Sequence, residues 1–217
     1  MVAATPDTLV PFASAQHLVL EGVSWDFYER VLAEIGNGAV RVAFDGGKIE
    51  IMSPLPEHEL IKKPLARLVE LMALERAVEL VGLGATTFRD AIAEKGLEPD
   101  ECYYVQHADA VRDIKGEYDP AVHTPPDLAI EVEVTRKSLP REPIYAALRV
   151  PELWVASERG IRCRHLQPGG QYADADRSLA FPFIAPADLW PWVVRLKGGE
   201  KSVAVLREFQ AWVRQIG

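Results

Sequence analysis

The chain has 217 residues and a formal net charge of −8, from 24 basic and 32 acidic side chains. Its composition, 48 % hydrophobic and 26 % charged, is typical of a globular protein and excludes a disordered or fibrous one. No apolar run approaches the roughly 18–20 residues that span a bilayer, and the negative charge argues against a large non-specific nucleic-acid surface. We expect a flexible tail over residues 1–18 and a single domain over residues 19–217.

The N-terminal stretch and the cysteines narrow the class of protein further. Residues 1–16 contain no Lys or Arg, unlike the basic start of a signal peptide, so we expect a cytoplasmic protein. Cys102 and Cys163 have no CxxC partner, which favours small buried side chains over a zinc site or a disulfide. Other histidines also lack the spacing of zinc ligands: His107, His123 and His165.

The first half of the chain alternates helical and strand patterns. Ser24 is a preferred N-cap residue and Gly36 a preferred terminator for the first helix. Asp45-Gly46-Gly47 is a strong hairpin signal. The expected elements are, in order, a helix over 25–35, strands over 39–44 and 48–52, a helix over 57–81, and short strands over 85–89, 91–94 and 101–106.

The second half begins with a polar stretch over residues 108–126. This stretch lacks periodicity and is longer than most structural connections, so we expect an active-site loop there. The elements that follow are a strand over 127–135, a helix over 141–149, a strand over 151–157, a hairpin over 161–173, a segment over 186–192 and a helix over 201–216. The order predicts one α/β domain, an α+β arrangement with a mixed sheet flanked by helices.

The strand over 127–135 reads Asp-Leu-Ala-Ile-Glu-Val-Glu-Val-Thr and is unusually acidic. With a period of two, Asp127, Glu131 and Glu133 share one face, and the other face is apolar. Same-face neighbours lie about 6.6–7 Å apart, so in a low dielectric the two glutamates repel each other unless a cation neutralises them or one is protonated. The pattern favours a divalent-metal site; the alternative is an amphipathic strand with a solvated acidic face.

Asp100 is a second candidate ligand, because it begins the preceding strand and a neighbouring strand would bring it close to Glu131. The alternative is that Pro99-Asp100 starts a turn.

Three segments together resemble the Uma-two family, bacterial proteins described as restriction endonucleases in the PD-(D/E)xK nuclease superfamily. They are Pro99-Asp100 ahead of a strand, Pro126-Asp127-Leu-Ala-Ile-Glu131-Val and Val150-Pro-Glu-Leu-Trp154. The resemblance covers about residues 20–190.

The resemblance implies a restriction-endonuclease-like core with Mg²⁺ or Mn²⁺ held by Asp100 and Glu131. The position two residues after Glu131, where the superfamily pattern has lysine, is Glu133 here. The resemblance therefore implies that a cation from the following segment, Lys137 or Arg141, serves the phosphate. Arg cannot act as a base at neutral pH, but it can neutralise transition-state charge.

Further carboxylates are candidates for the metal shell. Glu133 and Asp127 share the face of Glu131, and we expect both in or near the shell. The alternative for Asp127 is that it begins the strand and orients the loop after Pro126. Glu59, or its neighbour His58, matches the family at the head of the long helix as an outer ligand or a water-positioning group. The alternative is that both are exposed first-turn residues, which the helix dipole favours when they are acidic.

Together with the acidic strand, the resemblance implies a Mg²⁺-dependent endodeoxyribonuclease that hydrolyses DNA phosphodiester bonds and acts as a homodimer. We expect no membrane binding. The rival hypothesis is a degenerate nuclease fold that serves as a binding or interaction module. The missing lysine and the net charge of −8 favour that rival. A third hypothesis, a hydrolase of small phosphoesters, has no Gly-rich phosphate cradle to support it.

Overall fold

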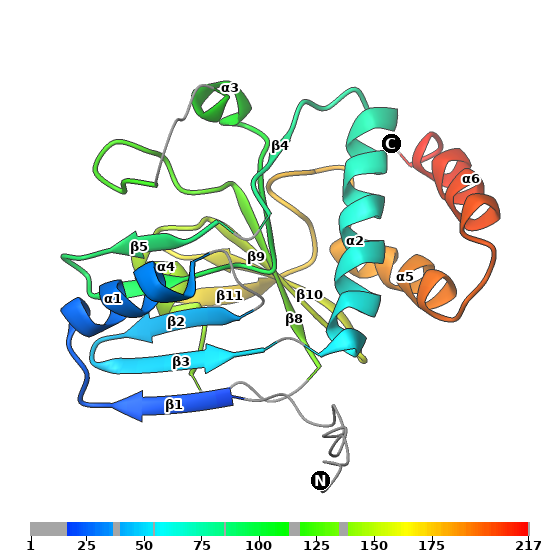
Figure 1. Ribbon diagram of the computed structural model, residues 1–217. Coiled ribbons are helices and arrows are strands. Elements are labelled where there is room, and N and C mark those ends of the chain that lie inside the picture. Colours follow the sequence, from blue (N-terminus) through cyan, green and yellow to red (C-terminus); the bar gives the residue numbers. More distant parts are fainter. Residues whose placement is uncertain are drawn as a thin grey trace, which may run out of the picture.

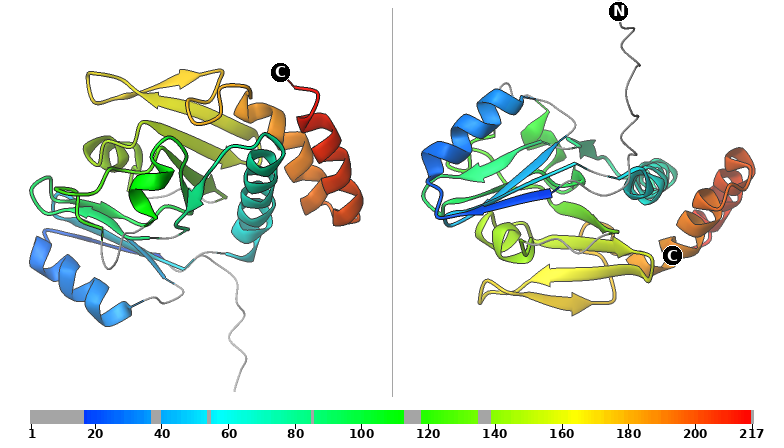
Figure 2. Two further views of the ribbon diagram at one scale, coloured as in Figure 1. Left: turned by 90° about the horizontal axis from the view of Figure 1, so that it is seen from above. Right: turned by 60° about the horizontal axis from the view of Figure 1, so that its bottom comes forward.

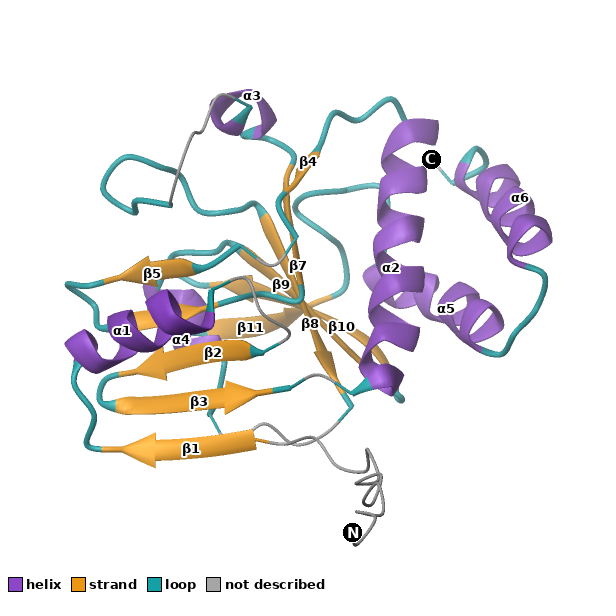
Figure 3. Cartoon of the chain, viewed as in Figure 1, coloured by secondary structure: helices purple, strands orange, loops and turns teal. Residues whose placement is uncertain are grey.

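The computed structural model describes residues 17–36, 40–53, 55–84, 86–112, 118–134 and 139–216 (Figure 1). These residues form two β-sheets with helices around them, a mixed α+β architecture as expected from the sequence (Figure 3). Every described helix is too short or too polar to span a lipid bilayer.

The first sheet is antiparallel throughout and has the strand order β1-β3-β2-β6-β5. Its strands are β1 (His17–Glu21), β2 (Arg41–Asp45), β3 (Lys48–Met52), β5 (Phe88–Asp90) and β6 (Lys95–Leu97). Helix α1 (Trp25–Ile35) packs on one face, where Tyr28 stacks on Phe44 with ring centroids 5.1 Å apart. This small aromatic core ties α1 to the sheet.

The second sheet has the order β11-β10-β9-β8-β7-β4 and contains one parallel pair, β8 with β9. Its strands are β4 (Val81–Gly82), β7 (Glu101–Tyr104), β8 (Leu128–Glu133), β9 (Glu152–Ser157), β10 (Gly160–Leu166) and β11 (Tyr172–Ala175). A parallel pair needs a crossover connection, and here helix α4 (Glu142–Ala147) lies on that connection.

The remaining helices are α2 (Pro56–Glu75), α3 (Ala108–Val111), the 3₁₀ turn η1 (Pro186–Leu189), α5 (Trp190–Lys197) and α6 (Ser202–Val213). Helices α2, α5 and α6 contact one another on one side of the molecule, away from α1 (Figures 1 and 2). They cover the face of the second sheet that carries Ile130, Val132 and Trp154.

The opposite face of the second sheet meets the first sheet and α4. Ala43 of β2, Cys102 of β7, Ala129 of β8 and Tyr145 of α4 belong to one buried cluster there. Strand β8 is therefore buried on both faces, as is usual for a strand in a parallel pair. The alternative hypothesis of a solvated acidic face is therefore wrong at Glu131, whose side chain is only 2 % exposed.

Several local predictions are confirmed. The Ser24 hydroxyl accepts a hydrogen bond from the backbone N–H of Phe27 at 3.2 Å, and Gly36 ends α1. Gly46 and Gly47 join β2 to β3 with positive φ angles of 49° and 92°, as a tight hairpin requires. Both cysteines are buried.

Other boundaries differ from the prediction. Helix α2 ends at Glu75 and not at residue 81, because Ala77 takes a left-handed φ of 51° and the N–H of Val78 returns to the carbonyl of Ala73. Residues 91–94 form a turn and not a strand, since the Asp90 carboxylate accepts the N–H groups of Ile92 and Ala93.

The predicted tail and loop also need correction. The end of the predicted tail, His17 and Leu18, pairs with β3 in strand β1, so the sheet begins within residues 1–18. The polar stretch over 108–126 opens with the short helix α3. Prediction failed in both places because the apolar periodicity is too short to recognise.

Candidate metal centre

Asp100 and Glu131 face each other at the start of β7 and the middle of β8. The antiparallel register pairs Glu101 with Ile130, so the next step of the ladder sets Asp100 opposite Glu131. The backbone N–H of Val132 donates a hydrogen bond to Asp100 Oδ2 at 2.7 Å. Both carboxylates are 2 % exposed, which means that the fold holds two acidic groups almost out of contact with solvent.

Two side chains from helices hold this pair of carboxylates. Nε2 of His58, in the first turn of α2, lies 2.9 Å from Asp100 Oδ2. The hydroxyl of Tyr145, in α4, donates a hydrogen bond to Glu131 Oε1. Burial raises the pKa of Tyr145 well above its usual value, and the charges of Glu131 and Asp100 raise it further, so its hydroxyl remains a neutral donor.

A third buried carboxylate, Glu50, comes from the first sheet. Glu50 is 1 % exposed and its Oε2 lies 2.7 Å from Nη2 of Arg141. It pairs across the β2–β3 hairpin with Ala43, which belongs to the cluster between the sheets, so the two sheets contribute acidic groups to the same interface. Glu50 was not a candidate from the sequence, because one acidic residue in an alternating strand is typical of a solvated face.

Two of the other candidates, Glu133 at the end of β8 and Asp127 just before its start, make contacts outside this centre. Glu133 is 45 % exposed, and its carboxylate lies 3.9 Å from Arg162 Nη2. Asp127 Oδ2 accepts the backbone N–H groups of Val105 and His107, at 2.7 and 3.0 Å. Asp127 thus anchors the segment after β7, and its carboxylate is not directed at Asp100.

The last two candidates lie at the margins. Glu59 is 39 % exposed beside Lys62, with its Oε1 3.5 Å from Lys62 Nζ, and of the two α2 residues it is His58 that reaches Asp100. Lys137 lies outside the described residues. The structure therefore brings together Asp100 and Glu131, and it places Arg141 one helical turn before Tyr145, whose backbone N–H donates a hydrogen bond to the Arg141 carbonyl at 3.0 Å.

Comparison with known proteins identifies the family. The sequence profile of a family described as "Uma2: Putative restriction endonuclease" matches residues 25–193. The chain belongs to this family. A solved structure described as "a putative nuclease belonging to DUF820", from Anabaena variabilis, is also similar, with 13 % identity, a TM-score of 0.43 and coverage of 78 % of this chain and 90 % of that one. No curated protein gives a significant match.

In this Uma2-family chain, the donor set at Asp100 and Glu131 fits a hard divalent cation. Mg²⁺ and Mn²⁺ prefer carboxylate oxygens and usually keep several waters, so two or three protein carboxylates suffice. Asp100 and Glu131 supply buried carboxylate oxygens, and Glu50 is a further buried carboxylate at the interface between the two sheets.

Two surface hollows lie beside Arg141. One has a volume of about 1050 Å³ and the other about 630 Å³, and both are lined in part by Glu133, Pro140 and Arg141. The larger hollow is also lined by Arg159 and Arg162. A ligand in either hollow would meet Arg141, the residue that is ion-paired to Glu50.

Proposed function

We propose that this chain is a metal-dependent endonuclease that hydrolyses DNA phosphodiester bonds. The observation that supports this function most is the opposed pair Asp100 and Glu131, each 2 % exposed. Burying two carboxylates side by side is unfavourable unless hydrogen bonds and a positive charge compensate. A site that tolerates this arrangement within a family described as restriction endonucleases is best explained by cation binding.

Asp100 and Glu131 would hold Mg²⁺ or Mn²⁺, and Glu50, ion-paired with Arg141, is a further buried carboxylate at the interface between the sheets. The chemistry supplied by such a bound ion is a water nucleophile at neutral pH and neutralisation of charge on the phosphate. The N–H of Val132 and the side chain of His58 orient Asp100, and the Tyr145 hydroxyl orients Glu131. These contacts fix the two carboxylates before substrate arrives.

Arg141 is the residue that we assign to the scissile phosphate. Its Nη2 is ion-paired with Glu50, whereas its Nη1 is buried and makes no hydrogen bond within the described part of the chain. A guanidinium with a spare N–H group can donate to a phosphate oxygen and stabilise the extra charge of the transition state. Arg141 thereby takes the role that the absent lysine has in the superfamily pattern.

DNA is the proposed substrate because three arginines line the larger hollow next to Arg141. Arg159 and Arg162 line it together with Arg141, against the acidic Glu133 and Glu158. A phosphate backbone laid in the hollow would be attracted locally despite the overall charge of −8. Cutting both strands needs two such centres, which supports a homodimer. Light scattering of the purified chain measures its mass in solution and so tests for the dimer.

A second candidate function is a non-catalytic binding module on the same fold. The specific observation in its favour is Glu133, a half-exposed acidic residue at the position of the superfamily lysine. The two functions differ in their need for metal.

Two measurements on the wild-type chain separate them. Calorimetric titration with Mn²⁺ should show binding, and supercoiled plasmid should be nicked or linearised in Mn²⁺ but not in EDTA. Binding of DNA without uptake of Mn²⁺ and without cleavage would refute the nuclease and support the module.

A further inference from the structure

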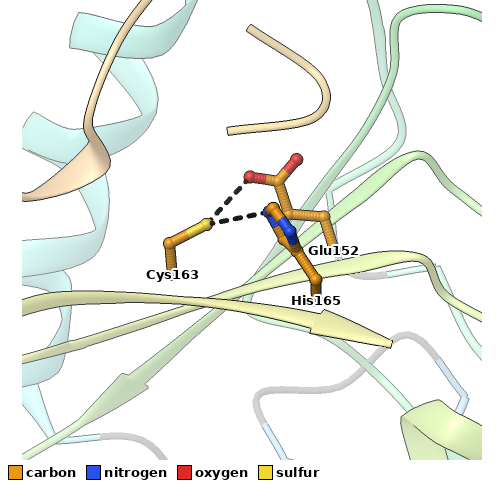
Figure 4. Close-up of side chains that lie close together, drawn as sticks. All are labelled: Glu152, Cys163 and His165. Atoms are coloured by element: carbon orange, nitrogen blue, oxygen red, sulfur yellow. Dashed lines mark hydrogen bonds between the residues drawn. The ribbon is translucent and has the colours of Figure 1, made fainter. Parts of the chain in front are cut away.

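A second group of metal-ligating side chains lies on the neighbouring strands β9 and β10 (Figure 4). Cys163 Sγ lies 3.2 Å from Glu152 Oε1 and 3.5 Å from His165 Nε2, and Figure 4 shows the sulfur directed between the two partners. The register pairs Cys163 with Trp154 and His165 with Glu152, so the three side chains project from one patch of one sheet face. Among the described residues, these three form the one group of three or more His, Cys and acidic side chains whose ligand atoms all lie within 4.8 Å of one another.

We propose that Glu152, Cys163 and His165 form a zinc site. Cys, His and Glu are all ligands that Zn²⁺ accepts, and three protein ligands with one open position are typical of a zinc centre that is accessible to solvent. In a tetrahedral site with Zn–S of about 2.3 Å and Zn–N of about 2.0–2.1 Å, the ligand atoms lie about 3.5 Å apart. The separations of Cys163 Sγ from Glu152 Oε1 and His165 Nε2, 3.2 and 3.5 Å, are close to that value.

Glu152 is a prepositioned ligand. Its Oε2 accepts hydrogen bonds from the Ser178 hydroxyl and from the N–H groups of Leu179 and Ala180. Its Oε1 accepts one from Trp154 Nε1 at 2.6 Å, and Cys163 occupies the remaining side of that oxygen. A zinc ion would take the place of the thiol proton between Sγ and Oε1 without displacing the other four donors.

Access to the group is from the side of His165. Glu152 and Cys163 are buried, at 0 % and 4 % exposed, whereas His165 is partly exposed and provides the route for an ion. Burial and the neighbouring Glu152 raise the pKa of the Cys163 thiol, so at neutral pH it is protonated and a poor nucleophile. A role as a catalytic cysteine is thus disfavoured, and zinc binding must release the thiol proton.

The zinc site is separate from the candidate metal centre. Glu152 shares its sheet face with Trp154, which packs in the cluster under α2, whereas Glu131 shares its face with Ala129, in the cluster between the two sheets. The register places Glu152 opposite Leu128, three residues from Glu131 along β8. The two sites therefore lie on opposite faces of one sheet, and each can be tested without the other.

The test is a calorimetric titration of the full chain, without a histidine tag, with Zn²⁺ in excess Mg²⁺ at neutral pH. We expect one site with about one proton released per zinc, measured from the heats in two buffers of different ionisation enthalpy. His165→Ala should weaken binding by about tenfold or more, whereas His123→Ala, a partly exposed histidine on a distant loop, should not. Co²⁺ in place of Zn²⁺ should give a thiolate-to-metal charge-transfer absorption that Cys163→Ala removes and Cys102→Ala keeps.

Glu131→Gln should leave this zinc affinity unchanged, which separates the proposal from the proposed nuclease function. Absence of zinc uptake by the folded wild-type chain would overturn the proposal. Equal zinc affinity of the wild type and folded His165→Ala would also overturn it, even if Cys163→Ala cannot be folded.

Discussion

Arg141 and Glu50 form an ion pair, 2.7 Å from Nη2 to Oε2, between the segment that follows β8 and strand β3 of the other sheet. Arg141 is 9 % exposed and Glu50 is 1 % exposed. The pair links the first sheet to the segment that carries Tyr145 onto Glu131. The contact that holds the two sheets together at this point is therefore also the contact that positions the proposed phosphate-binding arginine.

Removing both partners of this pair should cost less unfolding free energy than the two single removals added together. Arg141→Met leaves the buried Glu50 without this partner, and loss of one member of a buried pair costs about 3–5 kcal/mol. The double variant Glu50→Gln with Arg141→Met removes both charges, so its loss of unfolding free energy should be smaller than the sum of the single losses. Urea unfolding of the four proteins measures the coupling, and strictly additive losses would contradict this role.

Replacing Tyr145 by Phe should weaken metal binding without removing a ligand. The change deletes the hydroxyl that donates to Glu131, and loss of a contact that orients a ligand typically lowers metal affinity by about 10–100-fold. Tyr118→Phe is the matched control, because it also deletes one hydroxyl, here one that donates to the carbonyl of His123. Mn²⁺ titration compares them; equal affinities would show that Tyr145 does not position Glu131.

The tyrosines predict a loss of stability in alkali. Burial raises the pKa of all six: Tyr28, Tyr103, Tyr104, Tyr118, Tyr145 and Tyr172. Tyr118 is raised to about 12. Because the unfolded chain ionises near the usual value of 10.0 while the folded chain stays protonated, this stabilisation is complete below that pH and falls as the pH rises above it.

Absorbance of tyrosinate and circular dichroism should therefore change together above pH 10. Tyrosinate should form as the chain unfolds and not before. A large tyrosinate signal in a still-folded chain at pH 10.5 would contradict the burial of these hydroxyls.

Gly96 should be intolerant of a side chain. A Cβ at this position of β6 would overlap the Tyr28 hydroxyl and lie 2.8 Å from its Cζ, inside the aromatic core under α1. Gly96→Ala should lower the free energy of unfolding by about 1–3 kcal/mol, the usual cost of overpacking. Gly169→Ala has no neighbour within 4 Å and should change stability little, so thermal unfolding of the two variants tests the packing.

The parts of the site that depend on local pattern were predictable from the sequence. The alternation of Glu131 with Ile130 and Val132 marks a strand with a polar group on one face, and Pro99-Asp100 marks the start of the preceding strand. The register that opposes the two carboxylates is non-local, but it is short and antiparallel, and the family resemblance points to the same residues.

The parts that depend on pairing between distant segments were not predictable. Glu50 looks solvent-facing until the second sheet packs on its strand, and its partner is 91 residues away. Cys163 and His165 alternate on one face, yet their third partner, Glu152, comes from the adjacent strand. Helix α2 ends early through a left-handed residue that is an alanine and not the glycine that usually signals such an end.

The measurement that tests the central claim most directly is cleavage of supercoiled plasmid in Mn²⁺ by the wild type, Glu131→Gln and Glu75→Gln. Glu131→Gln removes one proposed ligand at nearly constant volume, whereas Glu75→Gln makes the same change at the contact between α2 and α6. We expect metal-dependent cleavage by the wild type and by Glu75→Gln, and loss of cleavage by at least about a hundredfold in a folded Glu131→Gln. Cleavage by Glu131→Gln at the wild-type rate would contradict it.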